Sequence, residues 1–291
     1  MNEIDEISSN INQTISICNE GEQNEYILKT MLELYYQGKG DGTIYNMAKI
    51  AYRIQIKDSD LVSQVLTLIY KKDGHFSALF GHTFIDLNFT YPWWTWRRHD
   101  EELKHGEPIH YFIQHANKAH LTFDGVRFID LNMHFPINQP PFVFCYLFLK
   151  PKMLLLLCRH GVSIENKLKS WSCESLLSVW IPIVFEKQDK ILNSNKKGGN
   201  DNILQNVISC VRILLRCVSC LRKELSFNDE IYKLSHWLPT LVNRLCQPAE
   251  LRHLCRCAIR SRLRNNWFLP HGIKKLPLPT LLQNYIDLLE D

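Results

Sequence analysis

The chain has 291 residues, of which 45% are hydrophobic, and a formal net charge of +4 at pH 7. This size and apolar content suit one elongated solenoid with a small appended module. The charge is too mild for the basic footprint of a nucleic-acid-binding domain. The sequence also lacks a Gly-rich phosphate loop, a Gly-x-Ser-x-Gly motif and a His-Glu-x-x-His motif, so we expect no catalytic site, cofactor or metal.

The first sixty residues are predicted to be helical. Residues 25–36 carry apolar side chains at helical spacing, and Gly38, Gly40 and Gly42 interrupt the pattern before a second apolar run at 44–54. We interpret residues 1–60 as a terminal helical cap, which would cover the open end of a solenoid.

Two similar strings begin one repeat length of about 33 residues apart. The first is Glu107-Pro108-Ile109-His110-Tyr111, and the second starts at Pro140-Pro141-Phe142 and closes at Met153 to Gly161. Gly161 fits a helix-terminating turn. Phe128-Ile129-Asp130-Leu131-Asn132 is echoed earlier by Phe84-Ile85-Asp86-Leu87-Asn88, with the insertion Trp93-Trp94-Thr95-Trp96-Arg97-Arg98 between them.

These strings resemble the Thr-Pro-Leu-His opening, the Leu-Leu-Leu-x-x-Gly close and the Gly-Ala-Asp-Val-Asn string of ankyrin repeats. Residues 61–70 and 207–217 are predicted to be further repeat helices, and the polar stretch near 187–202 to be an inserted loop. Residues 61–235 are therefore predicted to form about three to five degenerate ankyrin repeats. The apolar run 142–158 is divided at Lys150-Pro151-Lys152 into segments too short to span a membrane.

An amphipathic helix is predicted near the C-terminus, with Pro248 in its first turn and a stop at Asn265-Asn266. Apolar residues recur at i, i+3, i+4, i+7 and i+8, and arginines occupy the other face. The apolar positions are Leu251, Leu254, Cys255, Ala258, Ile259 and Leu263, and the arginines are Arg252, Arg256, Arg260, Arg262 and Arg264. By itself, this pattern is more typical of a core helix.

A proline-rich rail follows at Leu276-Pro277-Leu278-Pro279. Each proline fixes its own φ and biases the preceding leucine towards extended geometry, so this rail is predicted to be a preformed docking segment. Thr280 is predicted to cap a last short helix, with Gln283 at capping-box spacing. Its apolar face would comprise Leu281, Leu282, Tyr285, Ile286 and Leu289.

Together, the helix, the rail and the Leu282-x-x-Tyr285-Ile286 ending resemble a SOCS box as found in the ankyrin-repeat-and-SOCS-box family. Glu250 departs from the family pattern, which usually has Ser, Thr or Pro before the leucine. The resemblance implies an all-α fold, namely a degenerate ankyrin solenoid followed by a three-helix SOCS box at 236–291. It also implies an Elongin C contact through Leu251, Leu254, Cys255, Ala258 and Ile259, and a cullin contact through Leu276, Pro277, Leu278 and Pro279.

The implied role is that of a non-catalytic substrate adaptor of an Elongin B/C–Cullin-5–RING ubiquitin ligase. The Leu-Pro-Leu-Pro form of the rail is the reason for expecting Cullin-5, and the ankyrin repeats would hold an unidentified target protein. The alternative is an ankyrin scaffold whose C-terminal helices only cap the solenoid. A third reading, RNA binding through Trp93 to Arg98, has less support.

The ten cysteines are not arranged as a metal site. Cys145, Cys158, Cys210 and Cys255 lie in apolar helical patterns and are predicted to be small buried hydrophobes. Cys217-x-x-Cys220 lacks a second pair, which disfavours zinc, and His99-Asp100-Glu101-Glu102 with His105 is predicted to be charged surface. With a polar, acidic N-terminus lacking a signal-peptide pattern, the expected location is the cytoplasm, with the nucleus also open.

Overall fold

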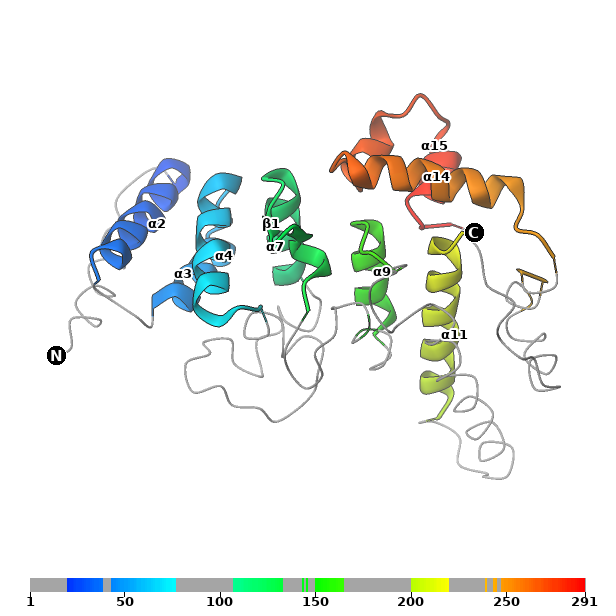
Figure 1. The fold of residues 1–291 in the computed structure, drawn as a ribbon, viewed down its shortest axis with the longest axis horizontal. Helices are drawn as coiled ribbons and strands as arrows, with labels where there is room; N and C mark the ends of the chain where they lie inside the picture. The colour runs from blue at the N-terminus through cyan, green and yellow to red at the C-terminus, as the bar shows by residue number, and fades with distance from the viewer. Residues whose placement is uncertain are drawn as a thin grey trace. The chain divides into compact units, whose positions relative to one another are not determined.

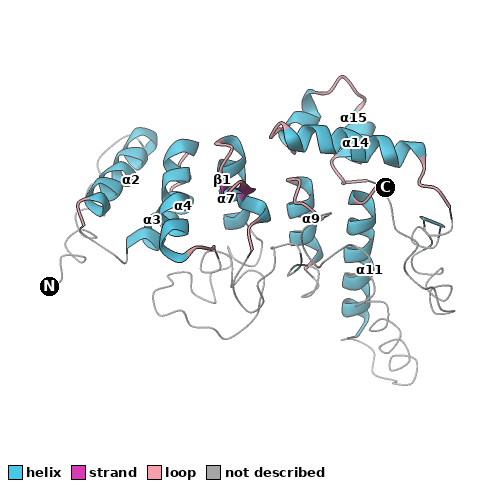
Figure 2. Cartoon of the chain, in the orientation of Figure 1, coloured by secondary structure: helices cyan, strands magenta, loops and turns pink. Residues whose placement is uncertain are grey.

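A computed structural model of the chain describes residues 20–38, 43–76, 107–132, 143, 145, 150–164, 200–219, 239, 243, 244 and 247–290. These residues are mostly helical (Figures 1 and 2). The chain divides into two compact units, Met1–Asn138 and Gln139–Asp291. Within the described residues, no helix combines the length and apolar character needed to cross a membrane.

The described part of the first unit contains the helices α2 (Glu20–Tyr36), α3 (Thr43–Arg53), α4 (Ser59–Asp73) and α7 (Glu107–Lys118). The helices predicted from residues 25–36, 44–54 and 61–70 are thus confirmed. Asp58 caps α4 by accepting hydrogen bonds from the amides of Asp60 at 2.9 Å and Leu61 at 3.2 Å. Gly74 ends α4 in the left-handed conformation, with φ of 71°.

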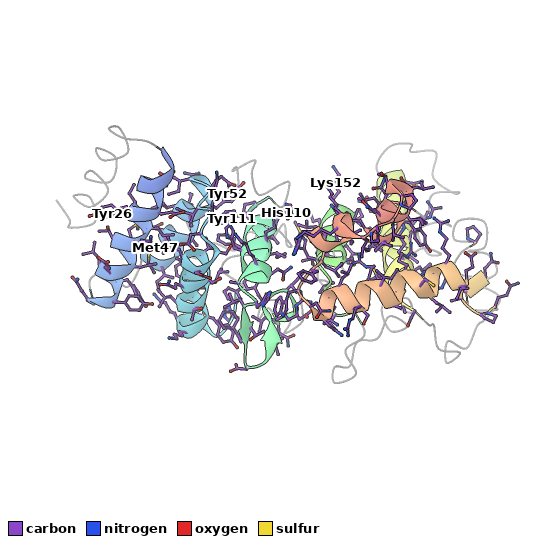
Figure 3. The ribbon with its side chains drawn as sticks, turned by 90° about the horizontal axis from the view of Figure 1, so that it is seen from above. Tyr26, Met47, Tyr52, His110, Tyr111 and Lys152 are labelled. Carbon is purple, nitrogen blue, oxygen red and sulfur yellow. The ribbon has the colours of Figure 1, made fainter. Side chains whose placement is uncertain are left out.

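A tyrosine joins α3 to α7 inside this unit. The Tyr111 hydroxyl donates to the carbonyl oxygens of Ala51 at 2.9 Å and Ile56 at 3.0 Å, just where α3 ends. Its ring meets that of Tyr52 edge to face, with the ring centres 5.6 Å apart. Both side chains are labelled in Figure 3. The Ala51 carbonyl in the last turn of α3 and the Ile56 carbonyl just after the helix are therefore hydrogen-bonded inside the core.

A β-hairpin follows α7, with strand β1 (Thr122–Phe123) paired antiparallel to β2 (Val126–Arg127). Its turn residues Asp124 and Gly125 have φ of 52° and 73°, which is the geometry that Asp-Gly favours in a two-residue hairpin loop. The 3-10 helix η1 (Phe128–Asp130) comes next. An ankyrin repeat combines a β-turn with two helices, so the order helix, hairpin and 3-10 helix differs from the ankyrin register expected at 107–132.

The second unit contains α9 (Pro151–Arg159), α11 (Asn200–Cys217), α14 (Leu251–Asn265), the 3-10 helix η3 (His271–Lys275) and α15 (Thr280–Ile286). Helices α9 and α11 pack against each other. Pro151 stands at the start of α9, so the predicted break at Lys150-Pro151 is confirmed, as is the turn at Gly161, where φ is 78°. The helix predicted at 207–217 is also confirmed, although α11 begins at Asn200, inside the stretch predicted as a loop.

Several predictions concern residues outside the described ranges. They include the string at Phe84 to Asn88, the tryptophan-rich insertion, the charged cluster from His99 to His105, and Cys220. Among the described residues, no group of three or more His, Cys, Asp or Glu side chains could hold a metal ion. The predicted domain boundaries at residues 60 and 235 stay predictions.

Candidate protein-docking face

Helix α14 begins at Leu251, with Glu250 as its N-cap, and the Glu250 side chain makes no capping hydrogen bond. The prediction that Pro248 lies in the first turn is therefore wrong, because the helix starts three residues later. The predicted stop is confirmed. The helix ends at Asn265, and the Asn266 side chain donates to the Arg262 carbonyl oxygen at 2.8 Å.

An ordinary amphipathic helix buries its apolar residues and exposes its polar ones, but in α14 several apolar residues are exposed and several polar residues are buried. Its apolar side is open: Leu251 is 76% exposed and Leu254 41%, and Cys255 and Ala258 are exposed as well. The buried residues are polar, with Arg256 at 4% and Arg260 at 7% exposure, together with His253. Since leaving leucines in water while burying arginines costs free energy, an exposed apolar stripe of this kind marks an interaction surface.

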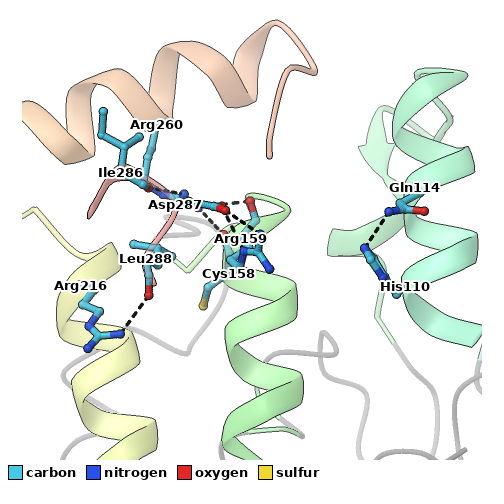
Figure 4. Close-up of polar contacts among 9 residues, drawn as sticks. All are labelled: His110, Gln114, Cys158, Arg159, Arg216, Arg260, Ile286, Asp287 and Leu288. Carbon is cyan, nitrogen blue, oxygen red and sulfur yellow. Dashed lines mark hydrogen bonds and ion pairs between the residues drawn. The ribbon is translucent and has the colours of Figure 1, made fainter. Parts of the chain in front are cut away.

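Arg260 is buried because it serves the C-terminal ends of two other helices. Its guanidinium donates to the Ile286 carbonyl oxygen at the end of α15 at 2.8 Å, and to the Cys158 carbonyl oxygen at the end of α9. Figure 4 shows both contacts, and Figure 1 shows α14 crossing the ends of α9 and α11. The last carbonyls of a helix lack internal partners and form its negative pole, so a cation there is favourable.

A salt bridge reinforces the same junction. Arg159 binds Asp287 through two parallel hydrogen bonds of 3.1 and 2.6 Å, the two-pronged geometry that guanidinium and carboxylate favour. Arg216 of α11 donates to the Leu288 carbonyl oxygen at 3.0 Å (Figure 4). The chain after α15 is thus held by arginines of both α9 and α11.

Two further polar side chains, those of Arg244 and His253, bind the end of α11. Arg244 donates to the carbonyl oxygens of Leu215 and Val218. His253 Nε2 lies 2.8 Å from the Val218 oxygen, and its Nδ1 lies 2.8 Å from an Arg256 nitrogen. Burial lowers the pKa of His253 to about 4. The ring is therefore neutral at pH 7, donating through Nε2 and accepting from Arg256 through Nδ1.

Gly161 shows how closely α14 and the following loop approach α9. A Cβ atom at this position would lie 2.8 Å from Leu269 Cδ1 and 3.2 Å from Arg264 Cγ. With φ of 78°, the backbone also adopts a conformation that favours glycine. Gly161 therefore ends its helix, as predicted, and also allows Leu269 and Arg264 to approach closely.

The residues after α14 enclose a small core of their own. Leu269, Ile273 and Ile286 are buried together, and Ile259, Leu263, Leu276 and Leu278 pack partly against them. Ile259 therefore lies at the edge of this core, in contrast to the four open residues of α14. We call Leu251, Leu254, Cys255 and Ala258 the docking face.

The two ends of the rail are extended, as predicted: Leu276 has φ of −71° and ψ of 138°, and Pro279 has φ of −54° and ψ of 148°. Between them the chain bends, because the Leu278 amide donates to the Leu276 carbonyl oxygen at 2.8 Å. The prediction of a polyproline-like segment, which has no internal hydrogen bonds, is therefore confirmed only at the ends. The leucines of the rail turn partly towards the small core, whereas Pro277 and Pro279 are exposed. The side chain of Gln283 donates to the carbonyl oxygens of Leu276 at 3.1 Å and Leu278 at 3.0 Å.

The predicted capping box is therefore wrong. Pro279, not Thr280, is the N-cap of α15, and Gln283 holds the rail instead of an amide of the helix start. The apolar face predicted for α15 is divided between the interior and solvent. Tyr285 and Ile286 are buried, but Leu281 and Leu289 are exposed.

Of the four cysteines that were predicted to be buried, three are buried and one is exposed. Cys145, Cys158 and Cys210 are buried, and burial raises the pKa of the Cys210 thiol to about 12. Cys255 was expected to be buried as well and is exposed on the docking face. A small side chain between two exposed leucines leaves room for a partner's side chain.

The C-terminal module thus combines an exposed docking face, a proline-rich rail and a short last helix. Residues 247–287 match the SOCS box family, so the chain carries a SOCS box.

The curated relatives carry that name too. "Ankyrin repeat and SOCS box protein 17" from Bos taurus is 46% identical over 56 residues, which is 19% of this chain and 19% of the relative. The human protein of the same name is 45% identical over 56 residues, again 19% of each chain. Human "Ankyrin repeat and SOCS box protein 10" is 33% identical over 86 residues, covering 30% of this chain and 17% of the relative.

The chain thus spans about a fifth of the length of the first of these relatives. No solved structure gives a match.

Proposed function

We propose that the chain is a substrate-recognition adaptor of an Elongin B/C–Cullin-5–RING ubiquitin ligase. The observation that carries the proposal is the open docking face on α14, within the residues that match the SOCS box. Such an adaptor does no covalent chemistry. It would hold a target protein close to the ubiquitin-charged enzyme, so that transfer becomes effectively intramolecular.

In this proposal, the docking face fills a groove of Elongin C. Leu251 and Leu254 would supply apolar area, and Cys255 and Ala258 would allow close approach between them. Burying one leucine side chain contributes about 1.5–3 kcal/mol, so two leucines could anchor the contact. Glu250 lies at the edge of the face as an exposed N-cap, and a partner would leave it in water.

The Elongin contact is testable by direct binding. We expect Leu251→Asp plus Cys255→Asp to weaken the affinity of the full chain for Elongin B/C by about 30-fold or more, because truncation of an anchor residue costs about 2 kcal/mol. Leu281→Asp is the matched control, since Leu281 is 61% exposed but lies on α15 outside the docking face. Calorimetric titration would measure all three proteins. Unchanged affinity in the double variant would contradict the assignment.

The cullin contact is assigned to the rail. Because its leucines pack partly inwards, Pro277 and Pro279 offer the more accessible surface. We expect Pro277→Ala plus Pro279→Ala to reduce Cullin-5 recruitment while Elongin B/C binding persists, with the exposed Pro248→Ala as control. Co-purification with Cullin-5 or Cullin-2 would show the choice of cullin. Recruitment of Cullin-2 instead would overturn the Cullin-5 proposal.

The scaffold alternative has one observation in its favour: α14 and Leu288, just after α15, bond to the ends of α9 and α11. The C-terminal module therefore has a structural role whichever function is correct, and loss of stability on truncation does not separate the two. The open docking face does favour the adaptor, because a helix that only capped a solenoid would bury its leucines. Target binding through ankyrin repeats also stays a proposal.

A further inference from the structure

Two cysteines meet at the ends of the neighbouring helices α9 and α11. Cys158 is buried in the last turn of α9, and Cys217 is the half-buried last residue of α11. Helix α14 contacts both of them. The Arg260 guanidinium donates to the Cys158 carbonyl oxygen, and the Cys257 sulfur, one turn earlier, lies 3.9 Å from the Cys217 carbonyl oxygen. Because residues three apart on a helix are neighbours, these contacts bring Cys158 and Cys217 together.

The side chains of this cysteine pair face the same space. The Cys158 and Cys217 thiols are hydrogen-bonded to each other, and both residues line a pocket of about 400 Å³. The exposed residues Leu254 and Ala258 of the docking face line it as well, so the pocket opens to solvent. A water molecule takes up about 30 Å³ in the liquid, so an oxidant as small as hydrogen peroxide can enter and reach the pair.

Cys217 is the more nucleophilic member of the pair. Its thiolate accepts the hydrogen bond of the Cys158 thiol, which is the main reason that the pKa of Cys217 is lowered and that of Cys158 is raised. Burial opposes the lowering, but the positive charge of Arg260 adds to it. That charge persists because the hydrogen bonds of Arg260 go to neutral carbonyl oxygens. The thiolate, not the thiol, is the nucleophilic form of cysteine.

We propose that the pair of Cys158 and Cys217 is an oxidation site, at which a peroxide forms a disulfide within the chain. The Cys217 thiolate attacks one oxygen atom of the peroxide and the O–O bond breaks. Cys217 becomes a sulfenic acid, and the hydroxide that leaves takes up the proton that Cys217 had lost. The Cys158 sulfur then attacks the Cys217 sulfur and displaces its hydroxyl group, which leaves with the Cys158 proton as water.

In this sequence the cysteine pair loses two electrons, and hydrogen peroxide is reduced to two water molecules. A thiol reductant reverses the change by attack on the disulfide. In a reducing compartment such a bond is transient, as cytosolic disulfides usually are. The inference does not depend on the proposed Elongin and cullin contacts.

Site mapping on the full reduced chain tests the proposal without any substitution. Hydrogen peroxide is added, samples are quenched with an alkylating reagent, and peptide mass spectrometry follows each cysteine. We expect Cys217 to be oxidised at least about 3-fold faster than Cys255, because a lower thiol pKa raises the thiolate population more than it reduces nucleophilicity. Cys255 is the more exposed of these two thiols. Accessibility alone would therefore give the reverse order, and that order would overturn the proposal.

The product should be a reducible link between Cys158 and Cys217. In Cys158→Ser we expect no disulfide at Cys217, but a sulfenic acid that dimedone traps. Cys257→Ser is the matched control, because Cys257 lines the same pocket and contacts Cys217 without belonging to the pair. It should oxidise at the parent rate and give the same link. A link in the parent chain from Cys217 to Cys257 or Cys220 would overturn the proposal, as would loss of the disulfide in Cys257→Ser.

Discussion

His253 makes the C-terminal module sensitive to acid. Its pKa is about 4 in the folded protein, below the ordinary value of 6.5. As the pH falls from 6.5 towards 4, the unfolded chain takes up a proton that the folded ring resists. Stability present above pH 6.5 is therefore lost through this window. We expect the contribution lost at pH 5 to be about 1–2 kcal/mol.

Hydrogen exchange of the α11 and α14 amides at pH 7 and pH 5, corrected for intrinsic rates, would measure this loss. A local readout is needed because His115 in the first unit also has its pKa lowered to about 4. His253→Gln serves as the reference, since an amide can replace the donor and acceptor without titrating. If both proteins lose the same protection at pH 5, His253 is not the cause.

At the scale of single elements, Gln283 couples α15 to the rail. Its two hydrogen bonds to the Leu276 and Leu278 carbonyl oxygens hold the rail in one conformation before any partner arrives. A preformed segment has less conformational entropy to lose on binding. We expect Gln283→Ala to weaken cullin recruitment about 3- to 10-fold, since one hydrogen bond contributes about 0.5–1.5 kcal/mol. Elongin B/C binding should be unchanged.

Competition binding of the chain–Elongin B/C complex to immobilised cullin would measure that effect. Asn284→Ala is a neighbouring control, since the Asn284 side chain donates to Glu290 at 3.1 Å rather than to the rail. Equal weakening by both substitutions would point to general loosening of α15, not to the rail.

Local sequence patterns predicted where helices lie, but they did not predict which side of a helix is buried. Periodicity predicted α4, α9, α11 and α14, because each has a repeating apolar stripe. It also divided α14 into leucine and arginine faces, yet it favoured burying the leucines. What reverses the orientation is non-local: Arg260 bonds to the Cys158 carbonyl oxygen, about a hundred residues earlier in the chain. No window of sequence contains both partners.

The β-hairpin was not predicted from the sequence, for a different reason. Asp124-Gly125 between the apolar residues Phe123 and Val126 is a strong local signal for a two-residue turn, and it was present in the sequence. The ankyrin register drawn through Glu107 and Phe128 left no place for it. The role of Gln283 was missed for a related reason: its spacing from Thr280 fits a capping box, but Pro279 takes the N-cap position.

At the scale of the whole molecule, the SOCS box is part of the second compact unit and not an appendage to it. Arg260 of α14 donates to carbonyl oxygens at the ends of α15 and α9. Arg216 of α11 donates to the Leu288 carbonyl oxygen, and Arg159 of α9 binds the Asp287 carboxylate. Removal of residues 247–291 would leave the Cys158 and Val218 carbonyl oxygens without Arg260 and His253. We therefore expect the deletion to lower amide protection of α9 and α11 by about 10-fold or more.

Hydrogen exchange by mass spectrometry would measure this, with α4 and α7 as internal references because they belong to the other compact unit. The full chain carrying Leu251→Asp plus Cys255→Asp is the matched comparison. It should lose Elongin B/C binding yet keep full protection of α9 and α11, since its substitutions lie on the open side of α14. Unchanged protection in the deletion variant would mean that the module is only attached. A loss in both would mean that the docking face also supports the fold.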